Sequence, residues 1–285
     1  MNTDKLDSRP QDLVYAPDGS ALAITCHDGY VVLCALVIHT STMPYSTVRL
    51  CSQDLFEDMI DVDFEFKKFR VAPKGPKGLG HATGSILWGQ GPSQHLLFAS
   101  SEPTGKGDNT GFHRAFDTSR GALAVQFDAT EAGDAAALSP DGVTLVLFTW
   151  GEGSTHPVRL YDVRRRDHEA YQTEELEKFK VRPLLDSTQG PSDSEEVNQA
   201  SFSPDGRLLA VARSDNALHV YDVRALSRGP LCRFEHHDSD AVGGGGFGIV
   251  TANWIQGRER IGIMSGGNDG RSPPRSGQIS WGLTP

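Results

Sequence analysis

The residues best suited to metal chemistry lie together near the C-terminal part of the chain. His236-His237-Asp238, with Asp240, supplies two imidazoles and two carboxylates, which are common zinc ligands. Adjacent side chains rarely point at one ion, however, and zinc ligands are more often separated by two or more residues. The stretch is interpreted as a polar loop, with a metal site as the alternative.

A Gly- and Lys-rich stretch, SEPTGKGDNTG from Ser101 to Gly111, resembles a phosphate-binding loop in composition only. That loop requires G-x-x-x-x-G-K followed by Ser or Thr, because its glycines and lysine hold the phosphates. Here Gly107 follows Lys106, and Ser100 occupies the first glycine position. A G-x-S-x-G nucleophile elbow is also absent from the sequence. The sequence therefore predicts no catalytic residue, no cofactor-binding residue and no metal ligand.

A third stretch, QASFSPDGRLLAVARSDNALHVYDVR from Gln199 to Arg224, brings Ser, Asp, His and Arg close together, but it is repeated. A weaker copy, AALSPDGVTLVLFTWGEGSTHPVRLYDVR, runs from Ala136 to Arg164. In both copies Pro-Asp-Gly separates short apolar runs, and these are residues that turns between strands require. The repetition indicates architecture rather than a catalytic constellation.

The same turn chemistry is found in three further units. The unit DLVYAPDGSALAITCHDGYVVLCAL, Asp12–Leu36, is a good match, the unit from Thr83 is a moderate one, and the last runs over Phe247–Gly270. Each unit predicts short antiparallel strands joined by tight turns. The residues that define the repeat are Asp18, Gly19, Asp28, Asp141, Gly142, Tyr161, Asp162, Asp205, Gly206, Asp215, Tyr221, Asp222 and Asp269.

These units resemble WD40 repeats, which commonly end in Trp-Asp after a turn that contains Asp. Tyr161-Asp162 and Tyr221-Asp222 stand at the Trp-Asp position, and Asp215 matches the turn aspartate. The Gly-His pair of the family does not precede either strong copy, so its hydrogen-bond network is not expected here. The closing unit also resembles the final blade of some uncharacterised fungal WD-repeat proteins, which implies no activity.

The resemblance implies an all-β fold, a single WD40-like β-propeller of about five four-stranded blades over residues 1–285, incomplete or irregularly closed. The expected blades are residues 12–50, 83–129, 134–182, 197–237 and 247–283, with insertions at 51–80 and 186–196. In the last blade, GQISWGL, Gly277–Leu283, is a candidate third strand. An open partial propeller, a shortened chain and a ring completed by another chain all remain possible explanations.

Charge and cysteine content limit the partners and the compartment. The net charge of -10 disfavours nucleic-acid or membrane-surface binding, and Arg164-Arg165-Arg166 is interpreted as a solvated loop because acidic residues flank it. Nowhere do about 18 uncharged apolar residues run together, as a membrane span would require. The four cysteines form no C-x-x-C pair, which favours a reducing cytoplasm or nucleus.

The sequence therefore favours a non-catalytic protein–protein interaction scaffold without a cofactor, binding other proteins through loops held on rigid blades. Two alternatives remain open: a metal-dependent propeller hydrolase of the lactonase type, and a truncated, non-functional fragment of a larger WD-repeat protein. The hydrolase predicts several carboxylates on the inner strands. The acidic and apolar stretch Asp54–Phe66 is interpreted as an amphipathic strand or helix on the rim, with a docking segment as the alternative.

Overall fold

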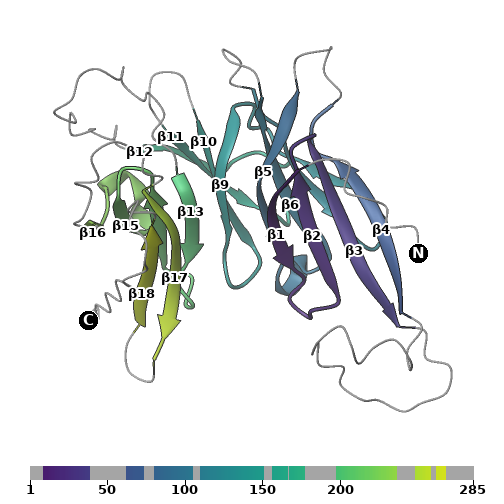
Figure 1. Ribbon diagram of the computed structural model, residues 1–285. Coiled ribbons are helices and arrows are strands. Elements are labelled where there is room, and N and C mark those ends of the chain that lie inside the picture. Colours follow the sequence, from purple (N-terminus) through teal and green to yellow (C-terminus); the bar gives the residue numbers. More distant parts are fainter. Residues whose placement is uncertain are drawn as a thin grey trace, which may run out of the picture.

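The computed structural model describes residues 9–38, 62–73, 80–104, 110–150, 156–165, 167–176, 197–235, 248–257 and 261–267. Within these ranges the chain forms five antiparallel sheets and two short 3-10 segments (Figure 1). No helix of the described residues is long and apolar enough to cross a membrane. The sheets follow one another in chain order, as propeller blades do.

Four of the sheets contain four strands each, and every strand pairs with the next one along the chain. Blade 1 contains β1 (Pro10–Tyr15), β2 (Ala21–Cys26), β3 (Tyr30–Ile38) and β4 (Val62–Arg70). Blade 2 contains β5 (His81–Trp88), η2 (Gly91–Ser93), β6 (Leu96–Pro103), β7 (His113–Asp117) and β8 (Ala122–Gln126). Blade 3 contains β9 (Ala132–Leu138), β10 (Thr144–Trp150), β11 (His156–Asp162) and β12 (Gln172–Leu176).

The remaining two sheets differ in size. Blade 4 contains β13 (Val197–Phe202), β14 (Leu208–Arg213), β15 (Ala217–Asp222), η3 (Val223–Arg228) and β16 (Cys232–Glu235). In the described residues blade 5 has only β17 (Ile249–Gln256) and β18 (Ile261–Gly267). The predicted strand Gly277–Leu283 and the turn residue Asp269 lie outside the described residues, as do residues 186–196 and His236–Asp240.

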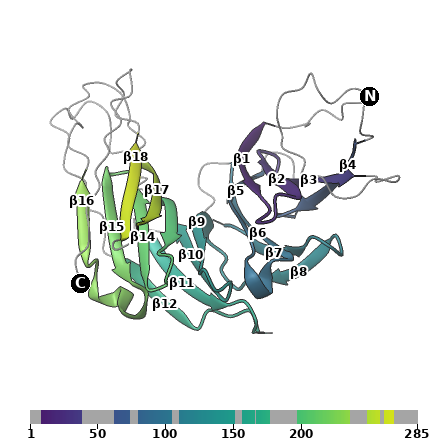
Figure 2. The same cartoon turned by 90° about the horizontal axis from the view of Figure 1, so that it is seen from below.

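Consecutive blades pack face to face through buried apolar side chains. One cluster lies between blades 1 and 2, a second between blades 2 and 3, a third between blades 3 and 4, and a smaller one between blades 4 and 5. The first strands of neighbouring blades meet near the centre of the arc. In the described residues blade 5 makes no extensive contact with blade 1, so the arc is open (Figure 2).

The same register recurs from blade to blade. The strand pair β2–β3 aligns Leu22 with Cys34, and the corresponding pairs align Leu97 with Phe116, Leu145 with Tyr161 and Leu209 with Tyr221. Because side chains alternate between the two faces of a strand, this shared register fixes which residues of each blade face the preceding blade.

Blade 1 departs from the expected boundaries. Residues 51–80 are predicted to be an insertion, yet Val62–Arg70 forms β4. This strand is antiparallel to β3, with Val62 opposite Ile38 at one end and Arg70 opposite Tyr30 at the other. The sequence VDFEF alternates polar and apolar residues with the period of a strand, and it belongs to the stretch Asp54–Phe66 that was interpreted as an amphipathic strand or helix on the rim. From Val62 onward this stretch is part of the blade. The fourth strand of blade 1 is therefore delayed in sequence, which a search for evenly spaced repeats misses.

Candidate functional site

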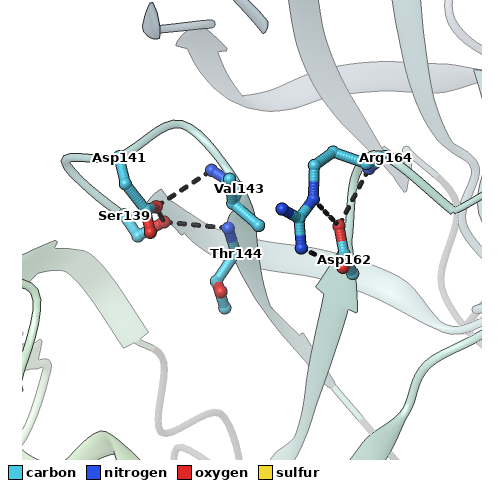
Figure 3. A network of polar contacts seen from close by, with 6 residues as sticks. All are labelled: Ser139, Asp141, Val143, Thr144, Asp162 and Arg164. Carbon is cyan, nitrogen blue, oxygen red and sulfur yellow. Dashed lines mark hydrogen bonds and ion pairs between the residues drawn. The ribbon is translucent and has the colours of Figure 1, made fainter. Parts of the chain in front are cut away.

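The Ser-Pro-Asp-Gly turn of blade 3 is held by a closed set of hydrogen bonds (Figure 3). The Ser139 hydroxyl donates to Asp141 Oδ1 at 2.5 Å, and its Oγ accepts from the Thr144 backbone N–H at 2.8 Å. Asp141 Oδ1 also accepts from the Val143 N–H at 3.0 Å. Gly142 supplies the positive φ of 70° that the turn requires. The serine and aspartate are therefore engaged in holding the turn.

The end of β11 lies beside this turn, because Thr144 pairs with Asp162 across β10 and β11. Asp162 Oδ1 accepts from the backbone N–H and Nε of Arg164 at 3.0 and 2.9 Å, and Oδ2 accepts from Nη2 at 2.7 Å (Figure 3). The carboxylate thus binds the guanidinium through both of its oxygens, and this bidentate contact fixes the orientation of the guanidinium.

Blade 4 repeats both arrangements. The Ser203 hydroxyl donates to Asp205 at 2.5 Å, and Ser203 Oγ accepts from the Leu208 N–H at 2.9 Å. At the strand end, Asp222 accepts from the Arg224 N–H, Nε and Nη2 at 2.9, 3.0 and 2.7 Å. The two copies of the repeated phrase therefore build the same local structure.

Blade 1 contains a variant of the turn, and blade 2 contains a variant of the strand-end Asp–Arg pair. In blade 1 alanine replaces the turn serine, and Asp18 instead accepts from the backbone N–H and hydroxyl of Ser20 at 2.9 and 2.7 Å. In blade 2 the strand-end aspartate is Asp117, which accepts from the Ser119 hydroxyl and lies 3.6 Å from Arg120 Nε. Asp117 was not among the predicted repeat residues, although the pair Phe116-Asp117 at the end of β7 is the sequence signal that marks it.

The strand-end pairs lie at one end of their blades, because Asp117, Asp162 and Asp222 hold the same position relative to the neighbouring strand. We call this set the Asp–Arg rim; it consists of Asp117, Arg120, Asp162, Arg164, Asp222 and Arg224. The Arg224 guanidinium and backbone N–H lower the pKa of Asp222 to about 2, and Arg164 likewise lowers the pKa of Asp162. The rim aspartates therefore remain ionised at neutral pH.

The two tyrosines at the Trp-Asp position are buried rather than part of the rim. The Tyr161 hydroxyl donates to Asp128 Oδ1 at 2.7 Å. Burial, the largest cause, and this hydrogen bond both raise the pKa of Tyr161. The Tyr221 hydroxyl lies 3.0 Å from His219 Nδ1. Each tyrosine packs in the cluster that joins its blade to the preceding one.

The turn aspartates Asp28 and Asp215 precede residues with positive φ, Gly29 at 77° and Asn216 at 62°. Asp28 is exposed. Asp215 Oδ2 accepts from Arg213 Nη2 at 2.7 Å, and the Arg213 side chain is only 4% exposed. Arg213 Nη1 also lies 3.1 Å from His219 Nδ1. This buried ion pair was not predicted, because the sequence RSD resembles an ordinary exposed turn.

A second buried polar network joins blades 2 and 3 and was also not predicted. His113 Nε2 lies 2.9 Å from the Glu131 carbonyl oxygen, and Nδ1 lies 3.0 Å from Ser100 Oγ. Because a carbonyl can only accept, Nε2 carries the proton and Nδ1 accepts from the serine. Glu131 Oε1 also accepts from Arg159 Nη2 at 2.6 Å. The sequence offered no signal for this network, since its members are far apart along the chain.

Lowering the pH should destabilise the fold through His113. Burial, the largest cause, lowers its pKa from 6.5 to about 4. The unfolded chain binds this proton near pH 6.5, so the contribution of neutral His113 is complete above that pH and is lost as the pH falls toward 4. We expect the melting temperature, measured by circular dichroism, to fall over this range.

The variant His113→Gln should show a shallower fall in melting temperature between these pH values, and the exposed-site control His95→Gln should follow wild type. Some decline should persist in His113→Gln, because burial also lowers the pKa of His219 to about 4. The same slope in His113→Gln and wild type would contradict the assignment.

A propeller hydrolase with a central metal would require several carboxylates on the innermost strand of each blade. On the described first strands of the five blades, the carboxylates are Asp12 and Asp134. Asp134 Oδ2 accepts from the Val197 backbone N–H at 3.0 Å and so connects blade 3 to blade 4. Within the described ranges there is no group of three or more His, Cys, Asp or Glu residues arranged to hold a metal ion.

Comparisons with known proteins agree with this geometry. A family model described as WD domain, G-beta repeat matches residues 183–222, and the match ends at the strand-end aspartate of blade 4. Among 1110 solved chains that match the fold, one described as the structure of the Dos1 propeller has a TM-score of 0.55 at 20% sequence identity. The match covers 92% of this chain and 55% of that one, so this chain spans about half its length. A search of curated proteins finds no match.

The sheets have the arrangement of a β-propeller, and residues 183–222 match a WD40 repeat. The predicted resemblance to WD40 repeats and the predicted all-β propeller fold are thus confirmed, and the described blades do not close into a ring. This chain carries Tyr-Asp-Val-Arg at the strand ends of blades 3 and 4, and the arginine of each Asp–Arg pair is exposed.

Proposed function

We propose that this propeller is a non-catalytic scaffold that binds other proteins through the Asp–Arg rim. One observation supports it most: the same oriented guanidinium is displayed on blades 3 and 4, with a looser counterpart on blade 2. The serine and aspartate side chains of the repeated phrase are engaged in turns and strand ends. A WD40 propeller fold is consistent with such a role.

The rim arginines have the properties of interface anchors. The side chains of Arg164 and Arg224 are 63% and 76% exposed, although each is held by two carboxylate oxygens. Holding a guanidinium in place before binding reduces the conformational entropy lost on association, and arginine is enriched among residues that dominate binding energy. The grip uses Nε and Nη2, so the Nη1 side of each guanidinium faces away from its aspartate.

The rim also suggests the chemistry of the partner. A carboxylate or an aromatic ring on a partner protein would suit a guanidinium whose position is fixed. A nucleic acid or a membrane surface suits it poorly, because the chain carries a net charge of -10. A cytoplasmic or nuclear location is part of the proposal and rests on the cysteine pattern.

The double variant Arg164→Ala/Arg224→Ala should lose binding while keeping its fold. Exposed ion pairs contribute little to stability, so the thermal melt should remain close to wild type. Two lost anchors at about 1 to 2 kcal/mol each should weaken partner binding at least about tenfold. Quantitative affinity capture from the native cell, followed by affinity measurement with the recovered protein, tests this.

The matched control is Lys68→Ala, which removes an exposed positive charge from the outer strand of blade 1. It should bind as wild type does. Failure to recover any reproducible partner would count against the scaffold itself. Equal binding by the double variant and wild type would instead place the interface elsewhere on the propeller.

A further inference from the structure

The face of blade 1 that points away from blade 2 has the residue pattern of an interface between blades. In blades 2, 3 and 4 the register pairs Trp88 with Leu97, Leu138 with Leu145, and Phe202 with Leu209. All six side chains are at most 9% exposed, because they pack against the preceding blade. In blade 1 the corresponding pair is Tyr15 with Leu22.

Blade 1 has no preceding blade in the described part of the chain, and neither residue of its corresponding pair is fully buried. Tyr15 is 59% exposed, and Leu13, two residues earlier on the same face, is 58% exposed. These are apolar residues at positions that the other three blades bury. An exposed apolar patch of this kind marks an interaction surface.

The last blade carries the complementary kind of face. In blade 4 the side chains of Gln199 and Ser201 bind blade 5: Gln199 Oε1 accepts from the Ala252 N–H at 2.6 Å, and Ser201 Oγ donates to its carbonyl at 2.9 Å. A bulge lies between Val197 and Gln199 in β13, and another between Ile249 and Thr251 in β17. This shared irregularity aligns the two strands.

The alignment places Thr251 and Asn253 where Gln199 and Ser201 stand in blade 4, and both are exposed. Ser201 pairs with Ala210, whereas Asn253 pairs with Met264. Ala210 is fully buried against blade 5, but Met264 is 49% exposed and Ile255 is 48% exposed. The outer face of blade 5 thus presents apolar and hydrogen-bonding side chains at positions where blade 4 contacts its successor.

We propose that a second copy of this chain covers these faces, with blade 5 of one copy packing on blade 1 of the next. The contact would continue the interface that already occurs four times within the chain. A second copy is favoured over an unrelated partner because each chain carries both halves of this interface. The interface is heterologous, since two different faces meet, and it closes into a ring or extends according to the rotation between copies.

Sedimentation velocity of the full chain over a concentration series tests the proposal. The wild-type mass should rise above that of one chain as concentration increases. Tyr15→Asp, on blade 1, and Met264→Asp, on blade 5, should each reduce self-association at least tenfold. Leu231→Asp is the matched control, because Leu231 is 61% exposed and lies on neither end face; it should assemble as wild type does.

Mixing the two end variants gives the sharpest result. Tyr15→Asp retains an intact blade 5 face, and Met264→Asp retains an intact blade 1 face, so an equimolar mixture should form a pair that stops at two chains. Wild type that remains a single chain at every concentration would overturn the proposal, as would a variant that still assembles alone. Should an aspartate variant fail to melt cooperatively, Tyr15→Ser and Met264→Ser replace the pair.

Discussion

Replacing Gly142 with alanine is expected to lower the free energy of unfolding by at least about 4 kcal/mol, among the largest effects of a single substitution. An added Cβ would lie 1.9 Å from the carbonyl oxygen of Gln90, which is far inside van der Waals contact. The same turn accepts a buried hydrogen bond at 2.9 Å from the Ser93 hydroxyl to the Gly142 carbonyl. Making room for the methyl group must therefore separate blade 2 from blade 3.

Gly19→Ala is the matched control, because Gly19 occupies the same turn position in blade 1. Its φ is 72°, against 70° for Gly142, yet an added Cβ would meet no atom within 4 Å. Only the backbone penalty for alanine in the left-handed region remains, about 1 to 2 kcal/mol. Chemical denaturation followed by tryptophan fluorescence measures both. An equal decrease in the free energy of unfolding of the two variants would show that the close contact between blades 2 and 3 at Gly142 does not contribute to stability.

Removing the carboxylate of Asp215 is expected to cost about 3 kcal/mol or more, because it leaves the buried Arg213 guanidinium without its balancing charge. The side chains of Arg213 and Asp215 are 4% and 14% exposed, and their ion pair measures 2.7 Å. Taking such a charge out of water costs free energy, and this cost is offset only while its partner is present. The variant Asp215→Ala and the same denaturation measurement test this.

The comparison is with Asp222→Ala, which removes an ion pair of the same length, 2.7 Å, between residues two positions apart. The Arg224 side chain is 76% exposed and can return to water, so this loss should be much smaller than that of Asp215→Ala. Adding Arg213→Met to Asp215→Ala should restore part of the stability, because the unbalanced charge is then absent. A double variant no more stable than Asp215→Ala would refute the charge explanation.

The comparisons of Gly142 with Gly19 and of Asp215 with Asp222 distinguish repeat residues that stabilise the fold from repeat residues that are exposed at the surface. Gly142 and Asp215 lie where blades meet or where charge is buried, so they should determine stability. Gly19 occupies the same turn position as Gly142 without a neighbouring blade in contact, and Asp222 ends a strand beside an exposed arginine, so substitution should cost less at both. The Asp–Arg rim belongs to the second group, which is why it is available for binding without loss of fold.

The sequence by itself determined the local structure of this protein. Ser-Pro-Asp-Gly and Tyr-Asp-Val-Arg specify turns and strand ends through neighbouring residues, and a period of two specifies strands. The propeller fold was therefore predictable, whereas the sequence left the closure of the ring open. The fourth strand of blade 1, Val62–Arg70, was assigned to an insertion because a long stretch of sequence separates it from the third strand, which ends at Ile38.

Only the tertiary structure decided which copies of a repeated residue are buried. Gly19 and Gly142 look alike in the sequence, as do the pairs Arg213–Asp215 and Asp222–Arg224, and His113 carries no local signal at all. Their environments differ because burial depends on the blade packed alongside, whose residues are often more than 40 positions away. Local patterns record turns and strands, whereas packing between blades sets the charge, exposure and pKa of each side chain.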